Sequence, residues 1–156
     1  MLRWLVCKSV ARQHATLFLE TTQPFQYALQ AKANAELLAH VLTHIAEDSF
    51  EVVLLALDGI AAFDYVKRAC FMRKLVANPE LHDIVPLVSA LYGSESTFLW
   101  ADDDGVLHFI VQAEGGEQGC PLMLALDALT QHDALVPANG NVLPNGNNSC
   151  FRYIPR

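Results

Sequence analysis

The sequence predicts an α/β fold of the α+β kind, in which helices accompany a small amount of sheet. Three observations support this class. Apolar residues recur at helical spacing over residues 31–47, an apolar β-branched run "FEVVLLAL" follows at 50–57, and an Asp-Gly pair separates two β-rich runs near residue 104. Because the elements do not alternate as strand and helix, a regular βαβ repeat is not expected.

The composition fits one folded domain with a buried core. Of the 156 residues, 53% are hydrophobic and 17% are charged, which argues against wholesale disorder. The apolar runs are too short to cross a bilayer, and Lys8 interrupts the N-terminal apolar stretch without a cleavage site after it. We therefore expect no membrane association and an intracellular location, nuclear or cytoplasmic. The formal net charge of −7 favours weak or no nucleic-acid binding by this chain alone.

The expected elements follow the chain in order. Residues 1–23 form an N-terminal segment without a clear pattern. A helix is expected over Ala31–Glu47, and "FEVVLLAL" is typical of a strand that is buried on both faces. After Gly59 the apolar period becomes helical up to about Val76, where Asn-Pro ends it. A second short helix is expected in "HDIVPLVSALYG", with Asp83 as a candidate N-cap.

The second half is expected to contain a hairpin, a glycine-bearing loop and a helix. "TFLWADDDGVLHFIVQ" predicts two strands joined by a turn at Asp103–Gly105. "AEGGEQGCP" is the loop, and "LMLALDALTQHDAL" is the helix, with Pro121 suited to its first turn. Residues 136–156 are rich in Asn, Gly and Pro, and we expect a disordered tail there.

The cysteines do not indicate a metal site or a disulfide framework. Cys7, Cys70, Cys120 and Cys150 are separated by long, irregular gaps, with no C-x-x-C pair. Free thiols in a reducing compartment are the simplest interpretation.

Asp58 and Asp64 are the candidate functional carboxylates. Asp58 lies where the expected strand ends, the position at which open sheets present a side chain to a cleft. It could equally cap the turn that follows, since a strand-end aspartate often does so. Asp64 suits the first turn of a helix, where the helix dipole favours an acid.

Three stretches together resemble reverse transcriptases of non-LTR retroelements. "LALDGIAAFDYVKRACFMRKL" resembles their motif A, an apolar strand followed by an aspartate, four residues and an aromatic. "AEGGEQGCPLMLALDALTQHDAL" looks like motif B, which reads roughly Q-G-x-P-L-x-P before a helix. "PFQYALQAKANAELLAHVL" is similar to the segment upstream, and the expected hairpin fits between the two motifs. The resemblance implies a partial palm and fingers region over residues 24–135.

The resemblance also implies roles for individual residues in the complete enzyme. Asp58 would be catalytic and a ligand of two Mg²⁺ ions, with the Gly59 carbonyl also facing a metal. Phe63 would pack beneath the sugar of the incoming deoxynucleotide. Gln118 and Gly119 would shape the loop over the nucleotide and the template base. The partners would be an RNA template, a DNA primer and deoxynucleotides.

The chain also departs from the family pattern. The family has an aromatic-x-Asp-Asp hairpin after motif B, and no such pair follows Gly119 in these 156 residues. "WADDDG" at Trp100–Gly105 precedes motif B, so we interpret it as a solvated turn. Leu124 stands where the family often has Pro, and Cys120 where a small polar residue is common. We therefore expect a fragment of an RNA-directed DNA polymerase that is inactive as this chain, or alternatively a non-catalytic remnant or interaction domain.

Overall fold

The computed structural model describes residues 2–24, 26, 29, 33–48 and 62–141. The helices and strands, in chain order, are α1 (Leu2–Gln13), α2 (Ala15–Thr22), α3 (Asn34–Asp48), α4 (Ala62–Tyr65), α5 (Arg68–Ala77), the 3₁₀ helix η1 (Pro79–Ile84), α6 (Val85–Tyr92), β1 (Ser96–Ala101), β2 (Leu107–Gln112) and α7 (Met123–Asn141). Helices thus accompany one two-stranded antiparallel sheet, and the general α+β class is confirmed. The strand expected at 50–57 lies outside the described residues.

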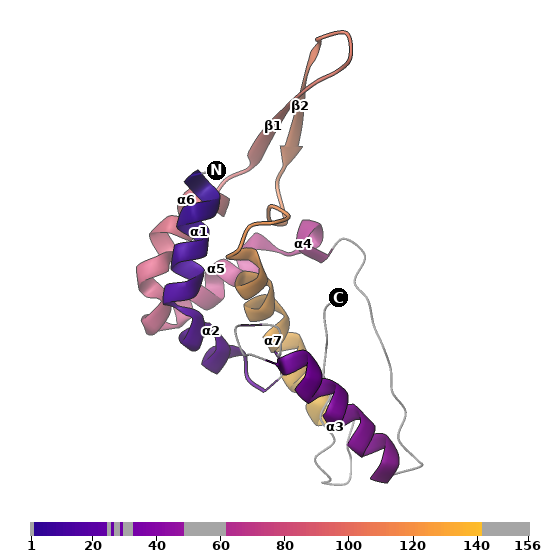
Figure 1. Ribbon diagram of the computed structural model, residues 1–156. Coiled ribbons are helices and arrows are strands. Elements are labelled where there is room, and N and C mark those ends of the chain that lie inside the picture. The colour runs from indigo at the N-terminus through magenta and orange to yellow at the C-terminus, as the bar shows by residue number, and fades with distance from the viewer. Residues whose placement is uncertain (1, 25, 27–28, 30–32, 49–61, 142–156) are drawn as a thin grey trace.

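The core lies where α7 meets α1, α2, α5, η1 and α6 (Figure 1). α7 crosses the other helices and supplies several fully buried side chains from its first half. The largest fully buried apolar side chains are Phe18, Phe71, Leu75, Leu81, Leu122, Met123, Leu126 and Leu129. Phe71 and Tyr92 meet edge to face, with ring centroids 5.8 Å apart, which is a favoured aromatic geometry. Burial of these apolar groups is what holds the helices together.

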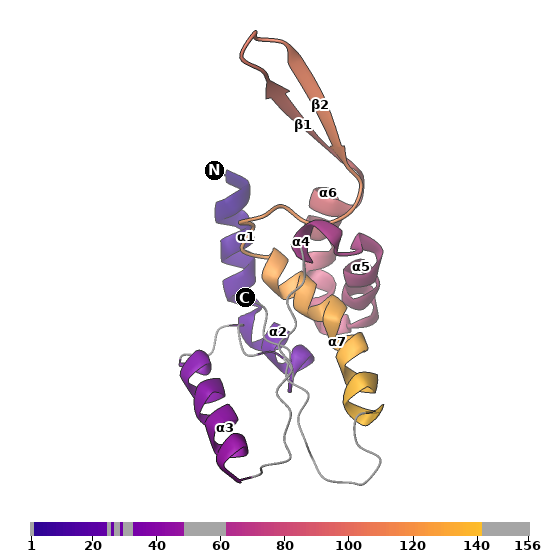
Figure 2. The ribbon, with the colours of Figure 1, turned by 90° about the vertical axis from the view of Figure 1, so that its right-hand side faces the viewer.

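The hairpin is a separate feature that projects from one end of the helical body (Figure 2). Its strands pair in the register Ser96 with Gln112 through Ala101 with Leu107. The predicted hairpin and its turn are therefore confirmed. Almost every residue of both strands is exposed, so the hairpin contributes little to the core.

The long helix expected after Gly59 is interrupted. α4 ends at Tyr65 and α5 begins at Arg68, and Lys67 between them has an extended backbone, with φ −76° and ψ 112°. The carbonyls of Phe63 and Val66 accept hydrogen bonds from a distant loop. Because those carbonyls are taken by the loop, they do not continue a helical ladder, and a prediction from local spacing alone missed the break.

The end of α5 agrees with the prediction, and the start of α6 does not. α5 stops at Ala77, and the side chain of Asn78 accepts a hydrogen bond from the Glu80 amide to begin η1. Asp83 is not the N-cap of α6, because η1 runs directly into α6 and Ile84 occupies that position. Here the preceding 3₁₀ turn takes the place of a side-chain cap.

The two ends of the described chain are more helical than the sequence indicated. The N-terminal segment forms α1 and α2, which anchor to the core through Cys7 and Phe18. The helix expected over Ala31–Glu47 is present as α3. α7 continues to Asn141, so residues 136–141, expected to begin the tail, are helical. Residues 142–156 lie outside the described part.

Candidate functional site

The loop that resembles motif B connects β2 to α7 through a series of turns. Two glycines in it adopt positive φ angles, 75° at Gly115 and 88° at Gly119. The Cys120 amide donates to the Glu117 carbonyl over 3.0 Å, and the Met123 amide donates to the Cys120 carbonyl over 3.0 Å. These turns set Gln118 and Gly119 at the outer bend of the loop, just before the buried start of α7.

The same loop is held against α4 by two backbone hydrogen bonds. The Gly115 amide donates to the Val66 carbonyl, and the Gly116 amide donates to the Phe63 carbonyl, each over 2.8 Å. A Cβ atom at Gly115 would lie 2.2 Å from the Asp64 carbonyl oxygen, so only glycine permits this approach. The part of the motif A-like run between Phe63 and Val66 is therefore in direct contact with the motif B-like loop.

Arg68 joins this contact to the base of the hairpin. Its side chain is buried, with a relative exposure of 6% for the residue. The guanidinium donates to the Gly115 carbonyl over 2.8 Å, to the Ser94 carbonyl over 2.6 Å and to the Ser96 hydroxyl over 3.3 Å. It also lies over the Tyr92 ring, 5.5 Å from the centroid. Four backbone segments thus meet at one side chain, because α5 carries Arg68 to the point where the hairpin and the loop leave the body.

The Glu114 carboxylate contacts the backbone of Arg68 and the side chain of Lys67. The Glu114 carboxylate accepts from the Arg68 amide over 2.9 Å and lies 3.7 Å from the Lys67 ammonium. This places a negative charge at the start of α5, where the exposed amides of a helix N-terminus favour it. Glu114 therefore fixes the beginning of α5 to the loop.

A cavity of about 190 Å³ lies beside the bend of the loop. Its lining comes from the loop and from α1, and consists of Arg3, Trp4, Glu117, Gln118, Gly119 and Cys120. A Cβ atom placed on Gly119 would meet no atom within 4 Å, so this turn faces open space. The two predicted loop residues therefore lie together on an accessible surface, next to an aromatic ring and a guanidinium.

Behind this cavity, polar groups of α1, α6 and the loop are packed closely. Arg3 Nε lies 2.9 Å from the Glu117 carboxylate, and the guanidinium lies 5.1 Å from the Tyr92 ring centroid. Burial raises the pKa of Tyr92 to about 12 and that of Cys7 to about 11. The neighbouring Cys120 thiol is the second cause of both shifts. Both groups stay protonated at neutral pH, so the Cys7 thiol is an unreactive core group rather than a nucleophile.

The predicted site residues have different outcomes. Asp58 and Gly59, the proposed metal-binding residues, lie outside the described residues. Phe63 is half-buried in α4 and packs against the core. Arg68, Arg3 and Trp4 were not predicted, because no motif marks an isolated arginine or tryptophan as part of a site.

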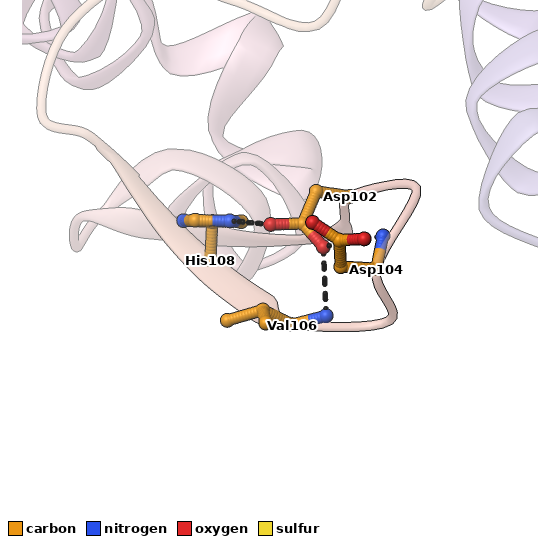
Figure 3. Close-up of polar contacts among 4 residues, drawn as sticks. All are labelled: Asp102, Asp104, Val106 and His108. Atoms are coloured by element: carbon orange, nitrogen blue, oxygen red, sulfur yellow. Dashed lines mark hydrogen bonds and ion pairs between the residues drawn. The ribbon is translucent and has the colours of Figure 1, made fainter.

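The acidic run at the hairpin tip is a structural turn. Figure 3 shows the Asp102 carboxylate accepting hydrogen bonds from the Val106 amide over 2.8 Å and from His108 Nε2 over 2.7 Å. The Asp104 amide also donates to this carboxylate, over 3.1 Å. These hydrogen bonds lower the pKa of Asp102, and the bond with His108 contributes most. The interpretation of "WADDDG" as a turn rather than a metal site agrees with this geometry.

No protein-family model, no curated protein and no solved structure matches this chain. Within the described ranges, no three His, Cys, Asp or Glu side chains come together as potential ligands of one metal ion. None of the described helices combines the length and the apolar character that a membrane span requires.

Proposed function

We propose that this chain is a palm fragment related to the reverse transcriptases of non-LTR retroelements, and that alone it does not polymerise DNA. One observation carries the proposal. The segment between α4 and α5, inside the motif A-like run, is joined to the motif B-like loop by the hydrogen bonds from Gly115 and Gly116 to Val66 and Phe63. Two stretches that resemble neighbouring parts of one polymerase site, and that are far apart in the sequence, are therefore in contact.

The cavity at the bend of the loop supports the same proposal. Gln118 and Gly119 are the residues that the resemblance places over the incoming nucleotide and the template base. They line an open cavity, and the left-handed turn at Gly119 leaves room for a planar group to approach the backbone. An amide side chain beside bare backbone suits the recognition of a base edge, since both can donate and accept hydrogen bonds.

The available carboxylates do not fit a two-magnesium centre. Two Mg²⁺ ions about 4 Å apart need more than one carboxylate to hold them. Within these 156 residues, no Asp-Asp pair follows Gly119 to complete the set with Asp58. Of the described acids in α4 and the loop, Asp64 is exposed, Glu114 is bonded to the start of α5, and Glu117 lies against Arg3. We therefore derive no catalytic step through a metal.

A non-catalytic interaction domain is the second candidate. The hairpin favours it, because both strands expose large apolar side chains and neither contains a charged residue. Surfaces of this kind mark contacts with other proteins. Such a domain would keep the scaffold of the palm without its chemistry.

Primer extension tests the inactivity. The purified chain is incubated with a primed RNA template, Mg²⁺ and deoxynucleotides, beside Asp58→Ala and the control Asp64→Ala. We expect no synthesis in any of the three reactions. Synthesis by the wild type and by Asp64→Ala that is lost in Asp58→Ala would show an active polymerase and overturn this part of the proposal.

NMR tests the ancestry independently of activity. In a palm, Asp58 and the bend at Gln118–Gly119 face the same cleft, so nuclear Overhauser contacts are expected between residues flanking Asp58 and the loop. If Asp58 instead contacts only its own turn, with no contact to the loop, the palm assignment fails and the interaction domain is favoured.

A further inference from the structure

The two faces of the hairpin differ, and the register defines them. Directly paired residues of antiparallel strands point to the same side of a sheet. One face therefore carries the pairs Thr97–Val111, Leu99–Phe109 and Ala101–Leu107. We call this set of six residues the apolar face. The opposite face carries Ser96–Gln112, Phe98–Ile110 and Trp100–His108.

The opposite face already has polar partners of its own. His108 Nε2 bonds the Asp102 carboxylate, and the His108 ring lies 5.0 Å from the Trp100 ring. At the base, the Ser96 hydroxyl accepts a hydrogen bond from Arg68. The opposite face also exposes Phe98, Ile110 and Trp100, so it mixes apolar side chains with the polar Ser96, His108 and Gln112.

The apolar face is exposed and has no polar side chain except that of Thr97. The relative exposures are 70% for Phe109, 65% for Leu99, 61% for Leu107 and 58% for Val111. Figure 1 and Figure 2 both show the hairpin standing clear of the helices. With roughly 150–250 Å² for an aromatic side chain and less for leucine and valine, these four expose on the order of 400–500 Å². This is as large as the greatest apolar patch of an ordinary monomer, and such patches often serve association.

We propose that two copies of this chain form a homodimer by packing their apolar faces together across a two-fold axis. A two-fold interface uses the same patch on both copies, so a continuous apolar face is complementary to itself. Two such patches would bury at most about 1,000 Å² in total, which is the lower limit for a specific interface. A hairpin of two strands is also marginal in water, and packing on a second sheet is the usual way to stabilise it.

The charges favour an antiparallel arrangement of the two hairpins. Asp102, Asp103 and Asp104 lie at the tip, and side-by-side tips would bring six carboxylates together. In the antiparallel arrangement each acidic tip instead approaches the base of the partner hairpin, where Lys67 and Arg68 balance the charges of Glu95 and Glu114. The central pair, Leu99–Phe109, then lies closest to the two-fold axis.

The position of Phe109 gives a sharp test with a matched control. Phe109→Lys places a charge on the apolar face, and Ile110→Lys places the same charge one residue away on the opposite face, where Ile110 is 54% exposed. Sedimentation velocity over a range of concentrations measures the dimer dissociation constant. We expect the wild type and Ile110→Lys to dimerise similarly, and Phe109→Lys to weaken the dimer at least about 30-fold, the loss typical of a hot spot.

A charge-exchange experiment tests the two-fold geometry. Because Phe109 lies near the axis, Phe109→Glu should also be monomeric, and a mixture of Phe109→Lys with Phe109→Glu should form a heterodimer. Circular dichroism of each variant shows whether the helical body is intact. The failure of both single variants to fold would not affect the wild-type measurement, which must show a dimer.

Three results would overturn the proposal. The first is a wild type that remains monomeric at every concentration, and the second is a dimer that Phe109→Lys does not weaken. The third is association that both lysine variants weaken equally, or that forms large assemblies without a dimer. Either behaviour would indicate unspecific or edge-to-edge pairing. None of these measurements involves nucleotides, so they can fail or succeed independently of the polymerase ancestry.

Discussion

Replacing Arg68 by alanine should loosen the hairpin base and the motif B-like loop at once. The guanidinium holds the carbonyls of Gly115 and Ser94 and the hydroxyl of Ser96. All three acceptors are neutral, so the variant leaves no unpaired buried charge behind. It does leave polar atoms without partners in a region from which water is largely excluded.

The size of the effect follows from these contacts. Each hydrogen bond from a charged donor contributes about 1.5–3 kcal/mol, but taking the guanidinium out of water offsets several kcal/mol of that sum. A buried acceptor that is left without its partner typically costs about 1–3 kcal/mol. We expect about 3 kcal/mol for Arg68→Ala, because Ser96 lies at a half-buried position where water can replace one bond. For a chain of this length that corresponds to about 6–12 °C in Tm.

Arg68→Lys separates charge from geometry. Lysine keeps the positive charge but has a single ammonium group, which lacks the planar fork that reaches three acceptors in different directions. We expect a loss of about 2 kcal/mol, closer to alanine than to the wild type. Arg73, exposed on the same helix, provides the control, and Arg73→Ala should change stability by less than about 0.5 kcal/mol.

Urea unfolding followed by circular dichroism measures these differences as shifts of the midpoint at constant slope. If Arg68→Ala unfolds within about 0.5 kcal/mol of the wild type, the contacts of Arg68 do not stabilise the fold. A lysine variant as stable as the wild type would show that charge alone is sufficient, and would refute the argument from geometry.

Two further substitutions test the loop and the core. Gly115→Ala should lower the free energy of unfolding by roughly 3 kcal/mol, because it combines left-handed strain with a clash against Asp64. The control Gly105→Ala has a similar φ of 79° but faces open space, so it should cost roughly 1 kcal/mol from strain alone. Equal losses of stability in thermal unfolding would contradict the close approach at Gly115. The Asp127 carboxylate accepts a hydrogen bond from Gln131 over 2.7 Å, and burial raises the pKa of Asp127. The ionised carboxylate is therefore less favourable in the folded chain than in the unfolded chain, so stability falls as the pH rises above the ordinary aspartate pKa of about 3.9. Asp127→Asn should therefore raise Tm at pH 7 by about 2–4 °C, for a gain of about 1 kcal/mol, and this gain should disappear near pH 3. A gain that persists at pH 3 would show that the ionisation of Asp127 is not its cause.

The elements that the sequence predicted well are those whose cause is local. The hairpin follows from a turn dipeptide between β-rich runs, and the end of α5 follows from Asn78 and the proline after it. α3 agrees because its apolar period repeats over several turns. In each case the residues that decide the structure are near one another in the chain.

The features that the sequence did not predict depend on distant contacts. The break between α4 and α5 exists because the loop at Gly115 takes the carbonyls of Val66 and Phe63. α1 has only one buried residue, Cys7, among its described side chains. Its sequence therefore lacks the apolar stripe from which a helix could have been predicted. Arg68 resembles a surface residue of an ordinary helix until the hairpin and the loop close around it. Of the described residues that the motifs marked, Gln118 and Gly119 line the cavity, whereas Phe63 packs against the core.

Arg68 also connects the two proposals, which otherwise depend on different parts of the molecule. Its side chain binds Ser94 and Ser96 where the hairpin leaves the body, and Gly115 where the loop turns toward Gln118. A force that reorients the hairpin therefore acts on the loop through the Arg68 guanidinium as well as through the backbone that joins β2 to the loop. If two copies pack through their hairpins, the strands gain a fixed direction, and the bonds of Arg68 help to pass that constraint to the loop that lines the cavity. The proposed interaction surface and the loop proposed to face a nucleotide would then belong to one connected unit.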